Sequence, residues 1–281
     1  LGGPEGCVGI DFGGTKVAVA ARTGDGNLRS VQHVFGADAS ATQVAHAAEQ
    51  LIAELQLDGV TAVGIATPGS LVDGGLLCAP NVAGWEEFPL EDWAAQTFPG
   101  AKIRVVNDVK AAALAEASAG RLSGQQVGIY FNLGTGVAAA VIVSGKPVSG
   151  QLGLAGEIGY APINSALAQS ATLEEFAGGV GFAKLGLRVP ETPDESWLRS
   201  ADGIAAATRI DELGSALATC VLLIAPEVVV LGGGMAANHY IFDRLANQIT
   251  AACPFPVQVL LSEFDENASL HGALFAAEEA R

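Results

Sequence analysis

Basic residues are scarce in this sequence. Lysine and arginine together number 14 against 30 aspartates and glutamates, and the formal net charge is −16. A surface with that balance repels nucleic acid and anionic lipid, so we expect neither as a partner. To bind an anionic substrate such as a nucleotide, the protein would need local positive charge from a metal ion, helix N-termini or a lysine.

Cysteine and histidine are also few and scattered. None of the four cysteines lies in a C-x-x-C pair, and none has one of the four histidines at metal-ligand spacing. The sequence therefore predicts no zinc site and indicates free thiols in a reducing compartment. No charge-free run reaches membrane-spanning length, and no basic segment followed by an apolar run opens the chain. We expect a cytoplasmic protein with no membrane contact.

The hydrophobic pattern alternates between strand and helix, which indicates an α/β fold. With 281 residues, 50% of them hydrophobic, the chain can form one large or two medium domains. We expect strands near residues 7–12, 17–22, 28–34, 60–66, 102–107, 126–133, 137–143, 227–232 and 256–261. We expect helices near 44–55, 108–120, 204–224, 239–251 and 267–280, and a surface excursion at 188–200.

One arrangement occurs twice along the chain. Residues 8–34 and 126–149 both begin with two strand-like segments around a turn of small residues. Two such halves predict a duplicated, two-lobed architecture with a ligand cleft between the lobes.

The first of these turns carries the chemistry of a phosphate site. Residues Asp11, Gly13, Gly14, Thr15 and Lys16 supply a carboxylate, two glycines, a hydroxyl and an ammonium group. Glycines let backbone N–H groups approach phosphate oxygens closely, and a neighbouring acid can hold Mg²⁺ through water. The same residues would also suit an ordinary Gly-Gly hairpin turn.

Two more glycine-rich turns follow apolar strands in the second half. Gly134, Thr135 and Gly136 can form a second phosphate clamp, or a tight hairpin. Gly233 and Gly234 follow the apolar run at 228–231, where an adenine or ribose could lie against the backbone.

Polar residues at the end of the strand near 102–107 suggest a catalytic base. The Asp108 carboxylate could take the proton from a sugar hydroxyl that attacks a γ-phosphate, while Asn107 orients the hydroxyls. Either residue could instead only cap the helix that follows. Asn81 offers a donor and an acceptor for sugar recognition, or an Asx turn. Glu157 lies between glycines, and Glu174 opens a helix.

Together these elements resemble the ROK family of sugar kinases and repressors, within the actin/hexokinase/Hsp70 superfamily. The resemblance extends from about Val8 to Ala277 and rests on the order and spacing of the segments 11–16, 80–81, 107–116, 133–136, 150–159 and 231–234. It implies a two-lobed ribonuclease-H-like (actin-like ATPase) fold with an interlobe cleft. We expect one lobe at residues 1–108, joined by the helix at 267–281, and a second lobe at 109–266 with nucleotide and dimer contacts.

The resemblance also implies roles for the site residues. Asp108 would be the catalytic base. The hexose would contact Asn81, Asn107, Asp108, Glu157 and Glu174. Mg-ATP would lie among Asp11, Gly13, Gly14, Thr15, Lys16, Thr135 and Gly233, with Gly134, Gly136 and Gly234 in the same turns. A homodimer is expected on the same ground.

The chain departs from the family pattern at one place. Family members continue Gly-Glu-Ile-Gly with a histidine that binds both sugar and zinc, whereas this chain has Tyr160. Residues 161–172, in place of the cysteine-rich zinc loop, contain no cysteine or histidine. We therefore expect no zinc, and we expect Tyr160 to offer a hydroxyl to the sugar.

The sequence thus predicts an ATP-dependent hexose kinase that acts at the C6 hydroxyl, with glucose as the expected preferred substrate. One alternative is an N-acetylmannosamine or N-acetylglucosamine kinase. An alternative of another class is a non-catalytic sugar-sensing regulator without its DNA-binding domain.

Overall fold

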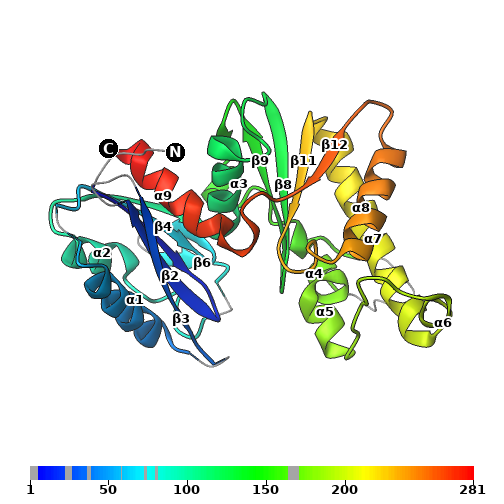
Figure 1. Ribbon diagram of the computed structural model, residues 1–281, viewed down its shortest axis with the longest axis horizontal. Helices are drawn as coiled ribbons and strands as arrows, with labels where there is room; N and C mark the ends of the chain where they lie inside the picture. Colours follow the sequence, from blue (N-terminus) through cyan, green and yellow to red (C-terminus); the bar gives the residue numbers. More distant parts are fainter. Residues whose placement is uncertain are drawn as a thin grey trace. The chain divides into compact units, whose positions relative to one another are not determined.

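The protein is an α/β molecule made of two compact units. The computed structural model describes residues 6–22, 27–36, 39–57, 59–72, 75–79, 82–163 and 171–281. The first unit takes residues 1–118, 149–154 and 267–281, and the second takes 119–148 and 155–266. Each unit is built on its own five-stranded sheet (Figure 1).

The sheet of the first unit has the order β3-β2-β1-β4-β7. An antiparallel meander forms its first half, and two strands parallel to β1 complete it, at the positions that the sequence predicts. The strands are β1 (Cys7–Phe12), β2 (Lys16–Arg22), β3 (Leu28–Val34), β4 (Ala62–Thr67) and β7 (Lys102–Asn107).

Helices cover both faces of this sheet. Alternate residues of β1, such as Val8 and Ile10, pack on α1 (Ala41–Leu55) and α2 (Leu90–Thr97), while Cys7 packs on α9 (Ala268–Ala280) from the other face (Figure 1). A strand covered on both faces is apolar throughout, because successive side chains point to opposite sides.

Close backbone contact fixes α9 on the sheet and on α3 (Asp108–Ala119). A Cβ on Gly64 would lie 1.8 Å from the Ala273 carbonyl oxygen, and one on Gly272 would lie 1.7 Å from that of Ala111. These approaches require glycine. They explain why α3 belongs to the first unit, which extends beyond the expected boundary at Asp108.

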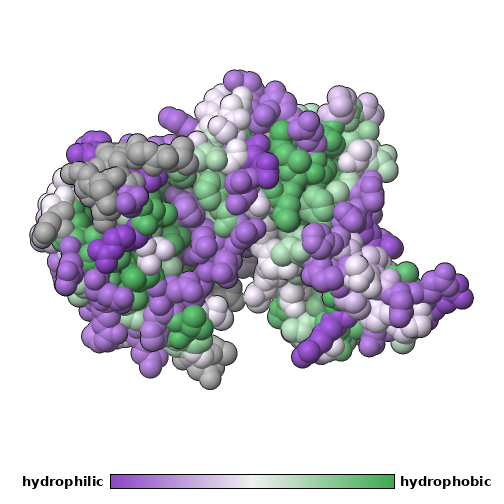
Figure 2. Space-filling view, viewed as in Figure 1, coloured by the Kyte–Doolittle hydropathy of each residue, from purple (hydrophilic) through white to green (hydrophobic). Residues whose placement is uncertain are grey.

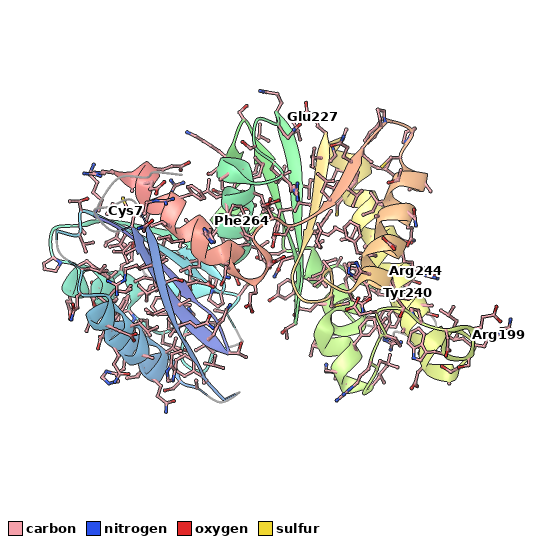
Figure 3. All side chains as sticks on the ribbon, in the orientation of Figure 1. Cys7, Arg199, Glu227, Tyr240, Arg244 and Phe264 are labelled. Atoms are coloured by element: carbon pink, nitrogen blue, oxygen red, sulfur yellow. The ribbon has the colours of Figure 1, made fainter. Side chains whose placement is uncertain are left out.

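The sheet of the second unit has the order β10-β9-β8-β11-β12. Its strands are β8 (Val127–Leu133), β9 (Val137–Val143), β10 (Lys146–Pro147), β11 (Val228–Gly232) and β12 (Gln258–Leu261), of which only β10 was not expected from the sequence. Because β11 runs parallel to β8 with Gly232 opposite Asn132, the turns that follow both strands lie at one edge. Glu227 lies at the other end of β11 (Figure 3) and accepts a hydrogen bond from Gln126 N at 2.8 Å.

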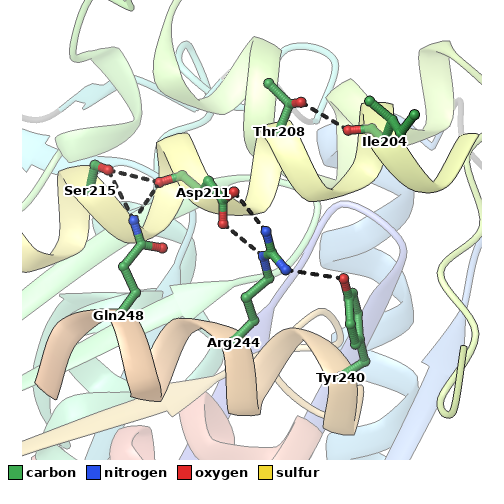
Figure 4. Close-up of polar contacts among 7 residues, drawn as sticks. All are labelled: Ile204, Thr208, Asp211, Ser215, Tyr240, Arg244 and Gln248. Carbon is green, nitrogen blue, oxygen red and sulfur yellow. Dashed lines mark hydrogen bonds and ion pairs between the residues drawn. The ribbon is translucent and has the colours of Figure 1, made fainter. Parts of the chain in front are cut away.

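A pair of long helices packs on this second sheet. Apolar residues of α7 (Ala201–Ile224) and α8 (His239–Ala252) share one core with β8 and β11. On their polar side, the Arg244 guanidinium donates two 2.7 Å hydrogen bonds to the Asp211 carboxylate, and Gln248 Nε2 donates to Ser215 Oγ at 3.1 Å (Figure 4). The bidentate geometry holds the two helices in register.

Several short elements were not expected from hydrophobic pattern alone. They are β5 (Ser70–Val72), β6 (Gly75–Leu77), α2, α5 (Gly179–Lys184), α6 (Glu195–Leu198) and the 3₁₀ turns at Gln151–Gly153, Ile158–Tyr160 and Asp265–Asn267. The helix α4 (Leu173–Ala177) begins at Leu173, next to Glu174, where the sequence predicts a helix to open. The segment 188–200, expected to be irregular, contains α6 because Asp194 caps its N-terminus.

The described surface mixes hydrophilic and hydrophobic residues on both units (Figure 2). Large apolar side chains reach solvent at Leu223, which is 82% exposed, and at Ile204, which is 58% exposed, both on α7. The expected homodimer stays a prediction. In the described part of the chain, no helix combines the length and the apolar character that crossing a membrane requires.

Candidate functional site

The carboxyl edge of the first sheet collects the polar residues that the sequence singled out. Asp11 pairs with Ala66 across β1 and β4, and the next residue of β4, Thr67, pairs with Asn107 of β7. Asp108 follows at the start of α3. Ligands of open α/β sheets bind outside the carboxyl ends of the strands, which is where these side chains lie.

Asp11 is a buried carboxylate. Its residue is 7% exposed, and burial raises the pKa of its carboxyl to about 6, although the Lys16 ammonium acts in the opposite direction. The charged form is therefore disfavoured inside the protein and would gain from a nearby cation.

The turn that follows Asp11 is a hairpin between β1 and β2. Gly13 N donates to Lys16 O at 2.9 Å, and Thr15 O accepts from Phe35 N at 2.8 Å, while Gly14 is only partly buried. The turn is therefore a hairpin, as one of the two interpretations of the sequence expected. A hairpin turn can also present its N–H groups to an anion such as phosphate.

Asn107 is the N-terminal cap of α3. Its Oδ1 accepts from Val109 N at 3.1 Å and from Lys110 N at 3.2 Å, and its Nδ2 donates to Gly69 O at 3.1 Å. Asp108 Oδ1 also accepts from Val109 N, at 2.8 Å. Both residues thus satisfy backbone donors of the helix, and neither contact rules out a second role.

The Gly134–Gly136 turn of the second unit is held by neighbouring backbone. Gly134 N donates to Gly136 O at 3.1 Å, and the carbonyls of Gly134 and Thr135 accept from Gly179 N and Val180 N of α5 at 2.9 and 3.0 Å. The turn is therefore a fixed loop and not a mobile tip.

Glu174 lies against this turn. Its Oε2 accepts from Val137 N at 3.0 Å, and a Cβ on Gly136 would lie 2.4 Å from the same oxygen. A Cβ on Gly159 would lie 3.2 Å from it. The sequence predicted that Glu174 opens a helix, and the family resemblance implied a sugar contact. The structure adds that its carboxylate binds the start of β9.

At Gly233, the glycine turn after β11 comes close to Leu133 and Asn132, which lead into the Gly134–Gly136 turn. Gly233 has φ +88°, and a Cβ there would lie 2.6 Å from Leu133 O and 2.9 Å from Asn132 Oδ1. Around Gly234 nothing lies within 4 Å of an added Cβ. Sequence reasoning missed Asn132, although an amide within the apolar run 127–133 was a visible signal.

The remaining candidates differ in how far the structure describes them. Glu157 directly precedes the Ile158–Tyr160 turn, and Tyr160 is 57% exposed. Asn81 and residues 164–170 lie outside the described residues. Within the described ranges, no group of three His, Cys, Asp or Glu residues could hold a metal ion. The absence of zinc stays a prediction, because the segment 161–172 is only partly described.

The donor set of the first unit fits a magnesium ion held through water. Asp11 supplies a hard carboxylate oxygen, and a cation would offset the cost of burying its charge. Magnesium usually keeps several waters and binds through one or two carboxylates plus substrate phosphates. Asp11 would be this chain's contribution to such a site.

Three comparisons place the chain among known proteins. It is 30% identical to an N-acetylmannosamine kinase of Yersinia pestis (strain Pestoides F), covering 94% of this chain and 95% of that one. It is 27% identical to a glucokinase of Thermotoga maritima, over 97% of each. The structure of a ROK family glucokinase from Streptomyces griseus in complex with glucose and AMPPNP superimposes with a TM-score of 0.77, at 26% identity and over 97% of this chain and 99% of that one.

The match to the family description is continuous. The ROK family pattern spans residues 7–280, which includes both sheets and every site segment described above. The chain belongs to the ROK family.

Proposed function

We propose that this protein is an ATP-dependent sugar kinase that transfers the γ-phosphoryl group to the C6 hydroxyl of a hexose, with glucose as the first substrate. The observation that carries the proposal is the alignment of Asp11 and Asn107–Asp108 along the carboxyl edge of one sheet. The candidate phosphate turn then follows β1, and the candidate base follows β7, with β4 between the two strands in the same sheet. Relatives that match nearly the full chain are named as sugar kinases, which supports the proposal.

In the proposed reaction, Asp108 accepts the proton from the C6 hydroxyl. The sugar oxygen forms the new bond to the γ-phosphorus in line with the bond to the leaving ADP, which breaks. Magnesium, when bound with ATP, supplies charge neutralisation on the phosphates. The protein contributes N–H groups of the turns at 13–16 and 134–136, the Lys16 ammonium, and Asp11 for the hydrated metal.

The identity of the sugar depends on the region of Tyr160. A phenol stands where the family has a zinc-bound histidine, and its side chain is 57% exposed. A less constrained contact favours weak discrimination at C2. The N-acetylmannosamine kinase relative keeps an N-acetylhexosamine as a second candidate substrate.

Replacement of Tyr160 tests this contact. Tyr160→Phe removes one hydroxyl, and the loss of one hydrogen bond is worth about 0.5–1.5 kcal/mol, or a factor of roughly two to ten. We expect KM for glucose to rise by that factor while kcat changes less, because the proposed contact is with the C1–C2 end of the sugar and not with the reacting C6 hydroxyl. Steady-state kinetics with each accepted hexose measures it. Unchanged KM values for all of them would make Tyr160 a structural residue.

The experiment for the function as a whole is an ADP-release assay across sugars. Glucose, mannose, fructose, allose, N-acetylmannosamine and N-acetylglucosamine are compared at equal concentration with Mg-ATP. We expect glucose to give the highest kcat/KM. Highest turnover with an N-acetylhexosamine would select the second candidate. Tight binding of a sugar, with no ADP formed in the presence of any of the sugars, would instead favour a regulator.

A further inference from the structure

Lys110 is a buried lysine in an unfavourable place. It is 5% exposed and lies in the first turn of α3, where residues 109–117 are all buried and mostly alanine. An ammonium group loses hydration on burial, and the N-terminal end of a helix carries a positive partial charge. Both effects act against folding, so the position is costly for a residue with no other use.

The side chain of Lys110 completes a closed ring of hydrogen bonds. Lys110 Nζ donates to Gly153 O at 2.7 Å, and Ser70 Oγ donates to the same carbonyl at 2.9 Å. Gly69, the neighbour of Ser70, accepts from Asn107 Nδ2, and Asn107 Oδ1 accepts from Lys110 N. Every member of the ring belongs to the first unit, including the segment 149–154.

The ring determines what the Asn107 amide can do. Val109 N and Lys110 N both bind Oδ1, which fills its two acceptor positions, and Gly69 O takes one N–H of Nδ2. One N–H remains for a ligand. Asn107 is thereby fixed as a donor, next to the carboxylate of Asp108.

We propose that Lys110 is a positioning residue of the kinase site. Its ammonium holds the Gly153 carbonyl, and through Ser70 and Gly69 this contact fixes the orientation of the Asn107 amide and of the adjoining Asp108. The inference rests on the proposed function, because it assigns Lys110 a task in the same reaction. A charge-assisted hydrogen bond to the carbonyl is stronger than a neutral one.

The test uses four variants. Lys110→Met keeps the length of the side chain but removes the charge and the hydrogen bond, and Lys110→Arg keeps the charge. Ser70→Ala removes the other donor to Gly153 O, and the fourth variant combines Lys110→Met with Ser70→Ala. Each is assayed for kcat and KM with the best hexose and with ATP, and its Tm is measured.

We expect Lys110→Met to stay folded with a Tm close to that of the original protein, because methionine fills similar apolar space and Ser70 Oγ still donates to Gly153 O. We expect its kcat to fall about 10- to 100-fold through misplacement of the reacting groups. KM for ATP should stay within about twofold, because the turn at 13–16 is not part of the ring. Lys110→Arg should recover kcat to within about fivefold of the original protein.

Ser70→Ala should lower kcat by about threefold. Combined with Lys110→Met it should add nothing further, because both groups act through one carbonyl. A kcat within twofold of the original in Lys110→Met overturns the proposal, as does a double variant in which the two losses multiply. A lowered Tm in Lys110→Met without rescue by Lys110→Arg would mark a purely structural residue. Absence of sugar-dependent turnover in the unmodified protein would overturn the proposed function itself, and this inference with it.

Discussion

At the scale of single residues, Asp108 combines two duties that can be separated. Its Oδ1 accepts from Val109 N, a contact that an asparagine oxygen reproduces. The proton-accepting capacity is lost in that exchange. A variant with asparagine therefore keeps the helix start and removes the base.

We expect Asp108→Asn to lower kcat by ~10²–10⁴, the usual contribution of a general base, while glucose still binds and Tm is retained. Steady-state kinetics together with calorimetric titration of glucose measures both effects. Activity within tenfold of the original would reduce Asp108 to a helix-terminus acceptor.

The buried carboxyl of Asp11 is expected to make the free energy of unfolding depend on pH. Its folded-state pKa of about 6 lies above the ordinary value of 3.8. The folded state therefore binds this proton more tightly than the unfolded state, so the group favours folding below pH 4. That stabilisation is lost as the pH rises through 6, and at neutral pH the buried charge costs about 3 kcal/mol.

Asp11→Asn removes this titration. Urea unfolding should show equal free energies of unfolding for the variant and the original at pH 4, and a variant more stable by about 2–3 kcal/mol at pH 7.5. The same variant should use Mg-ATP poorly. A stability difference that does not change with pH would contradict the burial argument.

At the scale of elements, the strands were the most predictable part of the fold. Runs such as 7–10 and 228–231 are apolar because every residue in them is buried, so neither face of these strands meets water. The short helix α6 depends on the Asp194 cap, and α2 depends on contacts with distant residues, such as that of Trp93 with Phe12, which periodicity cannot show. The Lys110–Gly153 and Ser70–Gly153 contacts join residues 43 and 83 positions apart, so only the folded structure reveals them.

The glycine turn of the second unit offers a matched pair of variants. Gly136→Ala would force its Cβ against Glu174 Oε2 and break the hydrogen bond to Val137 N. Gly134→Ala meets no atom closer than Asn132 Nδ2 at 3.9 Å. The first is expected to lower Tm. The second is expected to keep Tm and weaken ATP binding, because a side chain there hinders backbone approach to phosphate.

Calorimetry with ATP and thermal unfolding of both variants test this pair. Unchanged ATP affinity in a stable Gly134→Ala protein would remove the phosphate role from this turn. Equal loss of Tm in the two variants would show that the spacing around Gly134 is tighter than described.

At the scale of the whole molecule, the sequence predicted two sheets and a division between two lobes at residue 108. The first compact unit of the structure includes residues 1–118. Glycines on β4 and α9 account for the packing of α3 within the first unit. They let α9 contact the sheet and α3 at backbone distance. The pairing of Arg22 on β2 with Glu278 on α9 at 2.7 Å adds a salt bridge between distant ends of the chain. The sequence alone does not show which of its glycines allow a close backbone contact in the folded protein.

The central claim concerns a single transferred group, and phosphorus NMR of the product tests it most directly. The protein is incubated with Mg-ATP and glucose, and in parallel with 6-deoxyglucose, which lacks the accepting hydroxyl. The account predicts a glucose 6-phosphate resonance that grows with ADP in the first sample, and no sugar phosphate in the second. Inorganic phosphate as the sole product, phosphorylation of 6-deoxyglucose, or no turnover of ATP with any hexose would contradict it.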